Sequence, residues 1–363
     1  MSKNLLLAQP IVSIVIPFYN SFDFIDRCLD SVNIQIFRNY EVIVVDDGST
    51  YSFSKKYDNF LSNNKHIRCV THSSNFGVSA ARNTGIAESN GEFIFFLDAD
   101  DWLSKNALSN LIKHVNLNSE LVVAPHNQYL SPSNIKKKSY LVNNNEALLD
   151  KKTILEYVIN YLYLPYKYVM FVHCWNKLYS LKIIKEKKIL FEAELSQLED
   201  VNFNFKYLKF VNSISFSNTF DYFHYIENKS NSASGLAGSE RSSVEKCLVA
   251  FSSVKDYLGT NQFMTEDEKL KLLGHHFVST AIIYLIRMTR AFIKKPSLSN
   301  YKFIKRWIES PQLLANINYY KVQNGESSLI KVVIKIRNTT LFICSCFFRI
   351  QFLKLRVLLN RHR

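Results

Sequence analysis

The sequence predicts an α/β fold, in which a mostly parallel sheet flanked by helices is followed by a mainly helical C-terminal region. Three observations support this prediction. Short β-branched or aromatic apolar runs alternate with helical patterns four times before residue 100, as in sheets built from strand–helix–strand units. The connections are short enough for right-handed crossovers between parallel strands. Beyond residue 243 the apolar residues follow a helical spacing.

The N-terminal elements justify the sheet. Val12–Pro17 is a β-branched run and Phe93–Leu97 an aromatic one, and both are typical of strands buried on two faces. Two further strands are predicted at Glu41–Val45 and Ile67–Thr71. Helices are predicted from Phe22 to Val32, over a polar segment that ends near Ser62, and at Val78–Glu88.

The later elements are shorter and less regular. After Trp102 we expect, in chain order, a helix at Ser104–Val115, a strand at Leu121–Ala124, a polar loop at Tyr129–Asn145, a helix at Lys151–Tyr163, an extended piece at His173–Tyr179, a helix at Val201–Phe210, and strands at Ile214–Phe216 and Tyr222–Ile226. Asn228–Ser243 is rich in Ser, Asn and Gly, which is typical of a domain boundary. We therefore predict domains at 1–230 and 231–363, the second with helices at Val244–Leu258, Glu266–Ile293 and Tyr301–Ile308.

Carboxylates gather where two predicted strands end. Asp46 and Asp47 follow the second strand, and Asp98, Asp100 and Asp101 follow the fourth. Ligands of open parallel sheets bind at the carboxyl ends of strands, and carboxylates on one short turn repel one another unless a cation lies among them. A hard divalent ion is therefore one interpretation. The other is that Asp101 caps the helix that follows and that its neighbours are solvated.

Composition and charge limit the classes of function. The 363 residues are 47% hydrophobic, enough for a sizeable core, and 45 Lys and Arg against 31 Asp and Glu give a formal charge of +14. This excess favours anionic partners: nucleic acid, phosphorylated small molecules or an anionic membrane surface. Nucleic acid is not expected, because no groove-reading or base-stacking module is present and acidic turns would line the cleft. The turn PFYNS after the first strand lacks the Gly-x-Gly phosphate loop of a nicotinamide-dependent dehydrogenase.

The cysteines and apolar runs bear on the compartment. Six cysteines include no C-x-x-C pair, and we expect the reduced thiols of a cytosolic protein. The apolar run at the N-terminus is too short for a secretory signal, and no stretch reaches the roughly 18–20 apolar residues that span a bilayer. From Leu329 to Arg363 eight Lys or Arg and no acid are interleaved with apolar residues. This pattern predicts contact with anionic lipid, packing on the first domain, or a dimer interface.

Six motifs in a fixed order carry a resemblance. They are VSIVIPFYN at Val12–Asn20, EVIVVDDGS at Glu41–Ser49, NFGVSAARNTGI at Asn75–Ile86, GEFIFFLDADD at Gly91–Asp101, CWNKLY at Cys174–Tyr179 and LEDVNFNFKYL at Leu198–Leu208. Over roughly residues 11–226 the chain thus resembles family-2 glycosyltransferases, which have the Rossmann-like GT-A fold. The resemblance implies a nucleotide-diphosphate sugar donor, usually a UDP-sugar, and an inverting single displacement assisted by Mn²⁺ or Mg²⁺.

On the donor side, the resemblance assigns roles by position in the motifs. Asp100 would bind the metal, and Asp98 would bind the ribose or share the metal shell. His224 would complete that shell, although a lone histidine is more often structural. The nucleoside and diphosphate would be bound by Pro17, Tyr19, Asp46, Asp47, Arg82 and the Asp98–Ala99–Asp100 element, with Asp47 accepting from the uracil N–H.

On the acceptor side, the resemblance implies that Asp200 is the general base and that Glu199 assists it by orientation or by binding the acceptor. An acidic pair in a first helical turn is also expected from the helix dipole alone. Trp175 would offer an apolar platform to a sugar ring, with internal packing as the alternative. Polar contacts to the acceptor would come from Asn176, Lys177 and Asp101.

The function implied is transfer of a hexose or N-acetylhexosamine to a hydroxyl of a growing bacterial glycan, such as lipopolysaccharide, capsule or O-antigen. The partners would be the donor, a glycan or glycolipid acceptor and, through the C-terminal tail, anionic lipid on the inner face of the cytoplasmic membrane. A homodimer is also compatible with the sequence. The alternative function is a catalytically inactive nucleotide-sugar-binding or assembly subunit. Glucose, galactose and their N-acetylated forms are not distinguished.

Overall fold

The computed structural model describes residues 9–115, 120–131, 134–138, 148–165, 167–195, 197–226, 244–322 and 328–348. Contacts divide them into two compact units. The first contains the described residues of 9–158, 167–226 and 252–257, and the second contains those of 159–165, 244–251 and 258–348. The predicted boundary at Asn228–Ser243 lies outside the described part of the chain.

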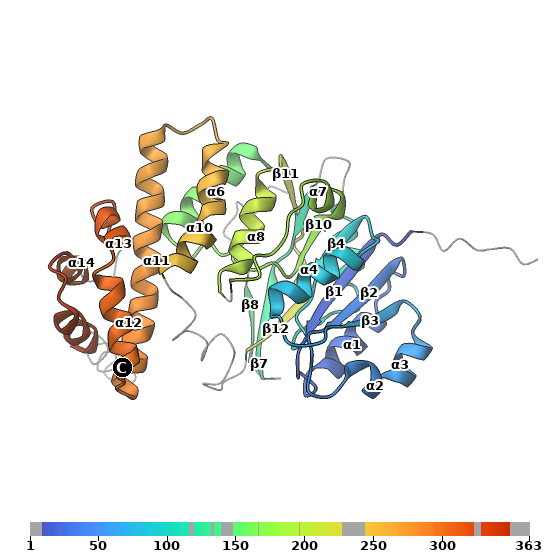
Figure 1. Cartoon of the computed structure of the whole chain (residues 1–363). Coiled ribbons are helices and arrows are strands. Elements are labelled where there is room, and N and C mark those ends of the chain that lie inside the picture. The colour runs from blue at the N-terminus through green and yellow to red at the C-terminus, as the bar shows by residue number, and fades with distance from the viewer. Residues whose placement is uncertain are drawn as a thin grey trace, which may run out of the picture. The chain divides into compact units, whose positions relative to one another are not determined.

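The main sheet of the first unit has eight strands, in the order β3-β2-β1-β4-β10-β6-β11-β9 (Figure 1). Strands β3, β2, β1 and β4 run parallel, as predicted, and β10 is antiparallel to both of its neighbours. The bounds are β1 (Val12–Phe18), β2 (Tyr40–Asp46), β3 (Ile67–Thr71), β4 (Phe93–Phe96), β6 (Leu121–Val123), β9 (Leu148–Asp150), β10 (Lys177–Ser180) and β11 (Ser213–Phe216).

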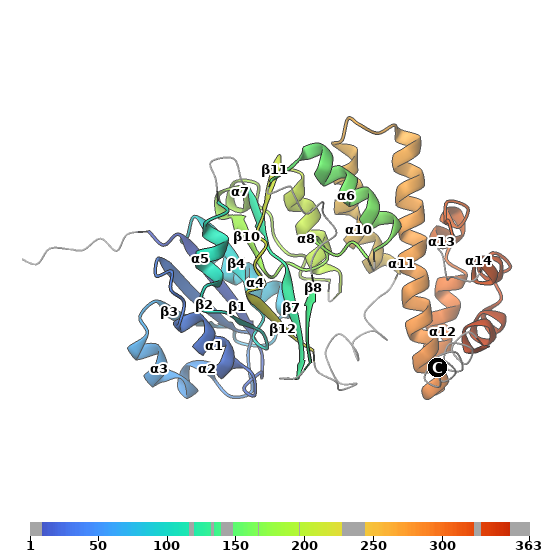
Figure 2. The same cartoon turned by 180° about the vertical axis from the view of Figure 1, so that it is seen from behind.

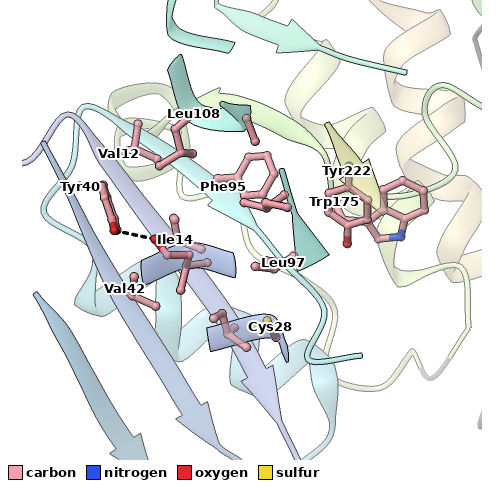
Figure 3. Packing of buried hydrophobic residues seen from close by; sticks show 14 of the residues in the cluster. Val12, Ile14, Cys28, Tyr40, Val42, Phe95, Leu97, Leu108, Trp175 and Tyr222 are labelled. Atoms are coloured by element: carbon pink, nitrogen blue, oxygen red, sulfur yellow. Dashed lines mark hydrogen bonds between the residues drawn. The ribbon is translucent and has the colours of Figure 1, made fainter. Parts of the chain in front are cut away.

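Helices cover both faces of this sheet (Figures 1 and 2). On one face, Ile14 of β1 and Phe95 of β4 share a core cluster with side chains of α1 (Ile25–Asn33) and α5 (Ala107–Ile112), part of which Figure 3 shows. On the other face, Phe96 meets the ring of Phe203, in α8, with centroids 5.7 Å apart. Because both faces are buried, these strands are apolar without alternation. The other helices of this region are α2 (Phe53–Lys56), α3 (Asp58–Asn63), α4 (Val78–Glu88), α6 (Lys151–Tyr163, shared with the second unit), α7 (Leu181–Glu186) and α8 (Glu199–Leu208).

The order of the parallel strands positions the candidate site. The chain adds β2 and β3 on one side of β1 and then places β4 on the other side. The connections therefore diverge between β1 and β4, and such a switch point leaves a crevice at the carboxyl ends of the strands. Tyr19 follows β1 and Asp98 follows β4 at this point.

A second sheet in the first unit has four strands, in the order β5-β12-β7-β8. The strands are β5 (Trp102–Leu103), β7 (His126–Ser131), β8 (Asn134–Lys138) and β12 (Tyr222–Tyr225). The prediction of a loop at Tyr129–Asn145 is wrong over its described part, where β7 and β8 pair antiparallel. The reason is that β8 is an exposed edge strand, which needs no apolar face and tolerates a polar, lysine-rich sequence.

The described part of the second unit is helical, as predicted. Its helix α11 begins at a capping box, in which Thr265 and Glu268 exchange hydrogen bonds between side chain and backbone. Trp307 of α12 is buried and its ring lies near Phe277 and Tyr284 of α11. The helices are α10 (Val244–Gly259, shared with the first unit), α11 (Glu266–Lys294), α12 (Leu298–Ile308), α13 (Pro311–Asn316) and α14 (Ser328–Lys335), and residues 339–348 are also helical. Among the helices described, none is long and apolar enough to cross a membrane.

We expect Gly85→Ala to destabilise the protein, although alanine favours a helix. A Cβ at position 85 of α4 would lie 2.2 Å from Cγ1 of Val15 in β1. The free energy of unfolding in urea should fall by about 2 kcal/mol, the usual effect of overpacking. The matched control is Gly259→Ala at the end of α10, where a Cβ would meet nothing within 4 Å. An equal, small effect of both substitutions would contradict the packing of α4 on β1.

Candidate active site

Arg82 joins two parts of the chain that are far apart in sequence. Its guanidinium donates to Oδ1 of Asp200 at 2.7 Å and to Oδ1 of Asp98 at 3.0 Å, and it lies 3.8 Å from Glu199. The side chain is buried, which by itself lowers the pKa of Arg82, but the carboxylates of Asp200 and Asp98 raise that pKa well above its usual value. The cation is therefore permanent, and it holds together carboxylates that would otherwise repel one another.

The backbone fixes the second oxygen of Asp200. Asp200 lies in the first turn of α8, and its Oδ2 accepts from the backbone N–H of Cys174 at 3.0 Å. The residue before the helix, Leu198, has a left-handed backbone with φ of 64° and gives no side-chain cap. This conformation is costly for a non-glycine residue. The backbone of Leu198 and the backbone N–H of Cys174 thus fix the orientation of the Asp200 carboxylate.

Glu199 lies in the same environment as Asp200, and its pKa is shifted. Its burial, followed by the charge of Asp200, raises the pKa of Glu199 to about 7, while Arg82 opposes the shift. A carboxyl group with this pKa exchanges protons near neutral pH.

The loop after β4 is tethered through Asp101. This carboxylate is fully buried and accepts from the hydroxyl of Tyr222 at 2.5 Å and from the backbone N–H of Tyr225 at 2.7 Å. Burial and the charges of Asp100 and Asp98 raise the pKa of Asp101 well above its ordinary value. Asp101 therefore ties the loop to β12. Asp101 does not cap the helix that follows, whose N-cap is Asn106, and its predicted contact with an acceptor stays a prediction.

Arg27 of α1 holds the same loop from the other side. Its guanidinium lies 3.7 Å from the ring centroid of Trp102 and donates to the backbone carbonyl of Asp100 at 2.9 Å. Tyr225 adds a second ring at 5.1 Å. Cation–π contacts of this kind are strongest when the cation is desolvated. Arg27 therefore positions the backbone between Asp98 and Trp102.

The side chains at the loop after β4 include ligands that suit a hard divalent cation. The carboxylates of Asp98 and Asp100 are partly exposed, and carboxylate oxygens suit Mg²⁺ and Mn²⁺. Among the described residues, Nδ1 of His224 is buried without a hydrogen-bond partner, and burial lowers the pKa of His224, so that its imidazole is neutral. No cluster of three or more potential metal ligands is already assembled in the described residues. Bound phosphates commonly supply the remaining ligands of such ions.

Asp46 and Asp47 build the turns next to this loop. Asp46 accepts from the backbone N–H groups of Ser49 and Phe53, both at 3.0 Å. Asp47 accepts from the N–H groups of Phe76 and Gly77, at 3.0 and 2.7 Å, and lies 2.7 Å from Nδ1 of His72. Both carboxylates are buried. A carboxylate has about four acceptor positions, so the predicted uracil contact of Asp47 stays a prediction.

Trp175 lies inside an aromatic stack. Its ring is stacked on His173 with centroids 4.6 Å apart and on Tyr222 with centroids 4.8 Å apart, the second contact visible in Figure 3. His126 meets it edge-on at 4.8 Å. Burial lowers the pKa of both His126 and His173 to about 3. Because both faces of Trp175 are covered, the structure supports internal packing, the alternative to the predicted sugar platform.

Asn176 and Lys177 also serve the structure of this turn. Asn176 donates to the backbone carbonyls of Ala124 and Pro125 at 2.8 and 2.9 Å. Lys177 is fully buried and donates to the carbonyl of His173 at 2.7 Å, and burial lowers its pKa to about 8. Their predicted contacts with an acceptor stay predictions.

The structure thus brings together some predicted residues and adds others. Arg82, Asp98, Glu199 and Asp200 meet directly, and Pro17 and exposed Tyr19 lie at the end of β1. Ala99 is buried in the core cluster, and its predicted donor contact stays a prediction. Sequence reasoning missed Arg27, His126, His173 and the N–H of Cys174. The sequence places Arg27 on the predicted helix after the first strand. That position does not reveal its partner on the loop after β4.

Comparisons with known proteins agree with this geometry. The model of the family named Glycosyl transferase family 2 matches residues 13–186. Residues 13–186 of this chain form a family-2 glycosyltransferase domain. The glycosyltransferase EpsJ of Bacillus subtilis is 29% identical over 197 residues, covering 54% of this chain and 55% of the relative. The poly(ribitol-phosphate) beta-glucosyltransferase of Bacillus spizizenii is 30% identical over 227 residues, covering 60% of this chain and 32% of the relative.

A solved structure shows the same GT-A fold. Residues 1–349 of S. aureus TarS in complex with UDP superpose with a TM-score of 0.63 at 20% sequence identity, covering 92% of this chain and 89% of that one. The complex of the same TarS residues with UDP-GlcNAc gives a TM-score of 0.61. The predicted fold class is confirmed by this likeness.

The pKa of Glu199 predicts a pH-dependent stability. Its pKa rises from near 4.5 in the unfolded chain to about 7 in the folded one, so the folded state binds more protons between these values. The stabilisation by protonated Glu199 is full below about pH 4 and is lost as the pH rises through 7. Glu199→Gln cannot ionise and should gain on the order of 2 kcal/mol over the wild type between pH 4 and pH 8 in chemical unfolding.

The control for this measurement is Glu194→Gln, which changes an exposed carboxylate five residues earlier. It should keep the pH dependence of the wild type. If Glu199→Gln lost as much stability as the wild type between pH 4 and pH 8, the buried environment assigned to Glu199 would be incorrect.

Proposed function

We propose that this chain is an inverting glycosyltransferase that moves a hexose or N-acetylhexosamine from a UDP-sugar to a hydroxyl of a growing bacterial glycan. One observation carries the proposal: Arg82 joins Asp98, at the end of β4, to Asp200, at the start of α8. The residues proposed for the donor and for the base thus share one centre, as a single displacement requires. The complexes of TarS with UDP and with UDP-GlcNAc support a uridine donor.

Asp200 is the proposed general base. Its carboxylate takes the proton of the acceptor hydroxyl while that oxygen forms a bond to the anomeric carbon. The bond from this carbon to the diphosphate breaks on the opposite face, so the configuration inverts, and UDP leaves with the electron pair. The hydrogen bonds from Arg82 and Cys174 hold the carboxylate in one orientation, which reduces the entropy lost in reaching the transition state.

Charge stabilisation at the diphosphate is the second requirement. Asp98 and Asp100, with His224, are the proposed ligands of Mn²⁺ or Mg²⁺, which when bound neutralises the diphosphate. Arg82 adds a fixed positive charge beside Asp98. Its Nε has no hydrogen-bond partner in the described part of the chain, which leaves one donor for a substrate oxygen.

Asp200→Asn should abolish transfer and leave donor binding nearly intact. Asparagine keeps the shape of the side chain and one acceptor oxygen but cannot take a proton. We expect the rate of UDP release with acceptor to fall by about 10³-fold or more, and the affinity for UDP with Mn²⁺ by calorimetry to change less than about threefold. The donor for this assay is chosen from UDP-glucose, UDP-galactose and their N-acetylated forms, each tested with Mn²⁺ and again with chelator.

Two results would count against the proposal. Equal loss of UDP binding and transfer in the variant would remove the assignment of Asp200 as base. Full activity of the wild type in the presence of chelator would contradict the proposed metal requirement. It would not contradict the single-displacement mechanism.

The C-terminal helices support a proposed contact with anionic membrane. In residues 328–348 there are three basic side chains and no acid. The exposed large apolar side chains of this segment are Leu329, Val332, Ile336, Leu341, Phe347 and Phe348. An apolar face flanked by Lys and Arg is typical of helices that lie in a membrane interface. The predicted residues Arg349, Lys354 and Arg356 of this tail lie outside the described residues.

Phe348→Glu should weaken binding to phosphatidylglycerol vesicles about tenfold in sedimentation, because it replaces an exposed ring that would insert into the membrane interface by a charge. Phe263→Glu is the matched control, since Phe263 and Phe348 are 67% and 69% exposed. The control should change binding less than twofold, and neutral phosphatidylcholine vesicles should bind poorly. Equal effects of the two substitutions would argue against a membrane contact through this segment.

A further inference from the structure

Strand β8 carries three consecutive lysines at the open edge of the small sheet. All residues of β8 are exposed. Lys138 pairs with His126 of β7, and Lys136 pairs with Gln128. Paired residues of neighbouring strands point to the same face, and successive residues alternate. Lys136 and Lys138 therefore share a face with His126, whereas Lys137 points to the other face, where its Nζ lies 5.2 Å from the ring centroid of Phe220.

The face of Lys136 and Lys138 leads to the candidate active site. Strand β12 pairs with β7, which places His224 beside Gln128 on this face. The ring of His126 lies 4.8 Å from Trp175 and 6.2 Å from His224. Figure 2 shows β12, β7 and β8 side by side. The order across the sheet is thus His224 on β12, His126 on β7 and the two lysines on β8.

Edge protection does not account for this arrangement by itself. Lysines on an edge strand discourage pairing with other chains whichever face they occupy. Here no ion pair joins Lys136 or Lys138 to a carboxylate among the described residues. The neighbours across β7 are a histidine and a glutamine, not acids. Two ammonium groups about 7 Å apart along the strand can each bind one phosphate of a phosphodiester chain as a point charge.

We propose that Lys136 and Lys138 bind phosphate carried by the acceptor, so that the acceptor of this enzyme is a phosphate-bearing glycan rather than a neutral one. This inference rests on the proposed function, because it places the acceptor along the face that ends at His224. The phosphate is either part of the glycan backbone or the diphosphate that joins the glycan to its lipid carrier. Both sources offer the same anionic oxygens to the two lysines.

The test is direct binding to the full chain, without donor, by fluorescence polarisation. The probes are a labelled glycerol-phosphate hexamer for backbone phosphate, a short-chain prenyl-diphosphate N-acetylglucosamine for lipid-linked phosphate, and neutral maltohexaose. Lys138→Gln should weaken binding of at least one phosphate probe about fivefold, and Lys137→Gln, which removes the same charge from the opposite face, less than about twofold. Lys138→Arg should restore binding. Salt should weaken the wild-type complex, since screening acts on exposed charges.

Three outcomes would overturn the inference: equal effects of Lys137→Gln and Lys138→Gln, equal affinity for maltohexaose, or equal affinity for an oligothymidylate of the same charge. The last would indicate a general polyanion surface. Failure of the proposed function is distinguishable, because it would appear as an absence of UDP binding in calorimetry. If the chain binds a phosphate probe, loses that binding in Lys138→Gln and does not bind UDP, the phosphate site is supported. The proposed glycosyl transfer is then contradicted.

Discussion

The bridge from Arg82 to Asp98 and Asp200 is the interaction on which the rest of the site depends. It spans 16 residues in one direction and 118 in the other, so α4, the end of β4 and the start of α8 must all be in place before it can form. A buried cation with several carboxylates around it is stable only as a set, since removing one partner leaves an uncompensated charge. The bridge therefore couples the folding of three segments to the assembly of one site.

Around this bridge, the loop after β4 is held from both sides. Asp101 binds Tyr222 and the backbone of Tyr225, and Arg27 binds the carbonyl of Asp100 above the ring of Trp102. Strand β12 of the small sheet thus helps to hold the loop that follows β4 of the large sheet. Side chains of a functional site are most accurately placed when a second layer of contacts fixes them, and here that layer comes from α1 and β12.

The sequence predicts the parallel half of the fold well because the information is local. The strands around Val12, Glu41, Ile67 and Phe93 are apolar on both faces, and their connections leave little choice of topology. The residues of the central bridge were also predictable, since Asp98, Arg82 and Asp200 each lie in a recognisable motif. Strand β8 was not, because an exposed edge strand carries no apolar period.

The hydrogen-bond partners of polar side chains could not be predicted from the sequence. Asn176 and Lys177 look like polar ligands in the sequence, yet backbone carbonyls of the same turn and of the segment after β6 satisfy them. Arg27 gave no local sign of its contact with Trp102. Polar side chains show their partners only when the tertiary fold brings those partners within hydrogen-bond distance.

The left-handed backbone of Leu198 has a consequence for how this centre can change. A leucine at φ of 64° is strained, and such strain persists only where the surroundings enforce it. A glycine or asparagine there would relax the backbone and give the first turn of α8 more freedom. The main chain at this apolar residue thus sets the direction of Glu199 and Asp200, and variation at position 198 would redirect both carboxylates without changing either side chain.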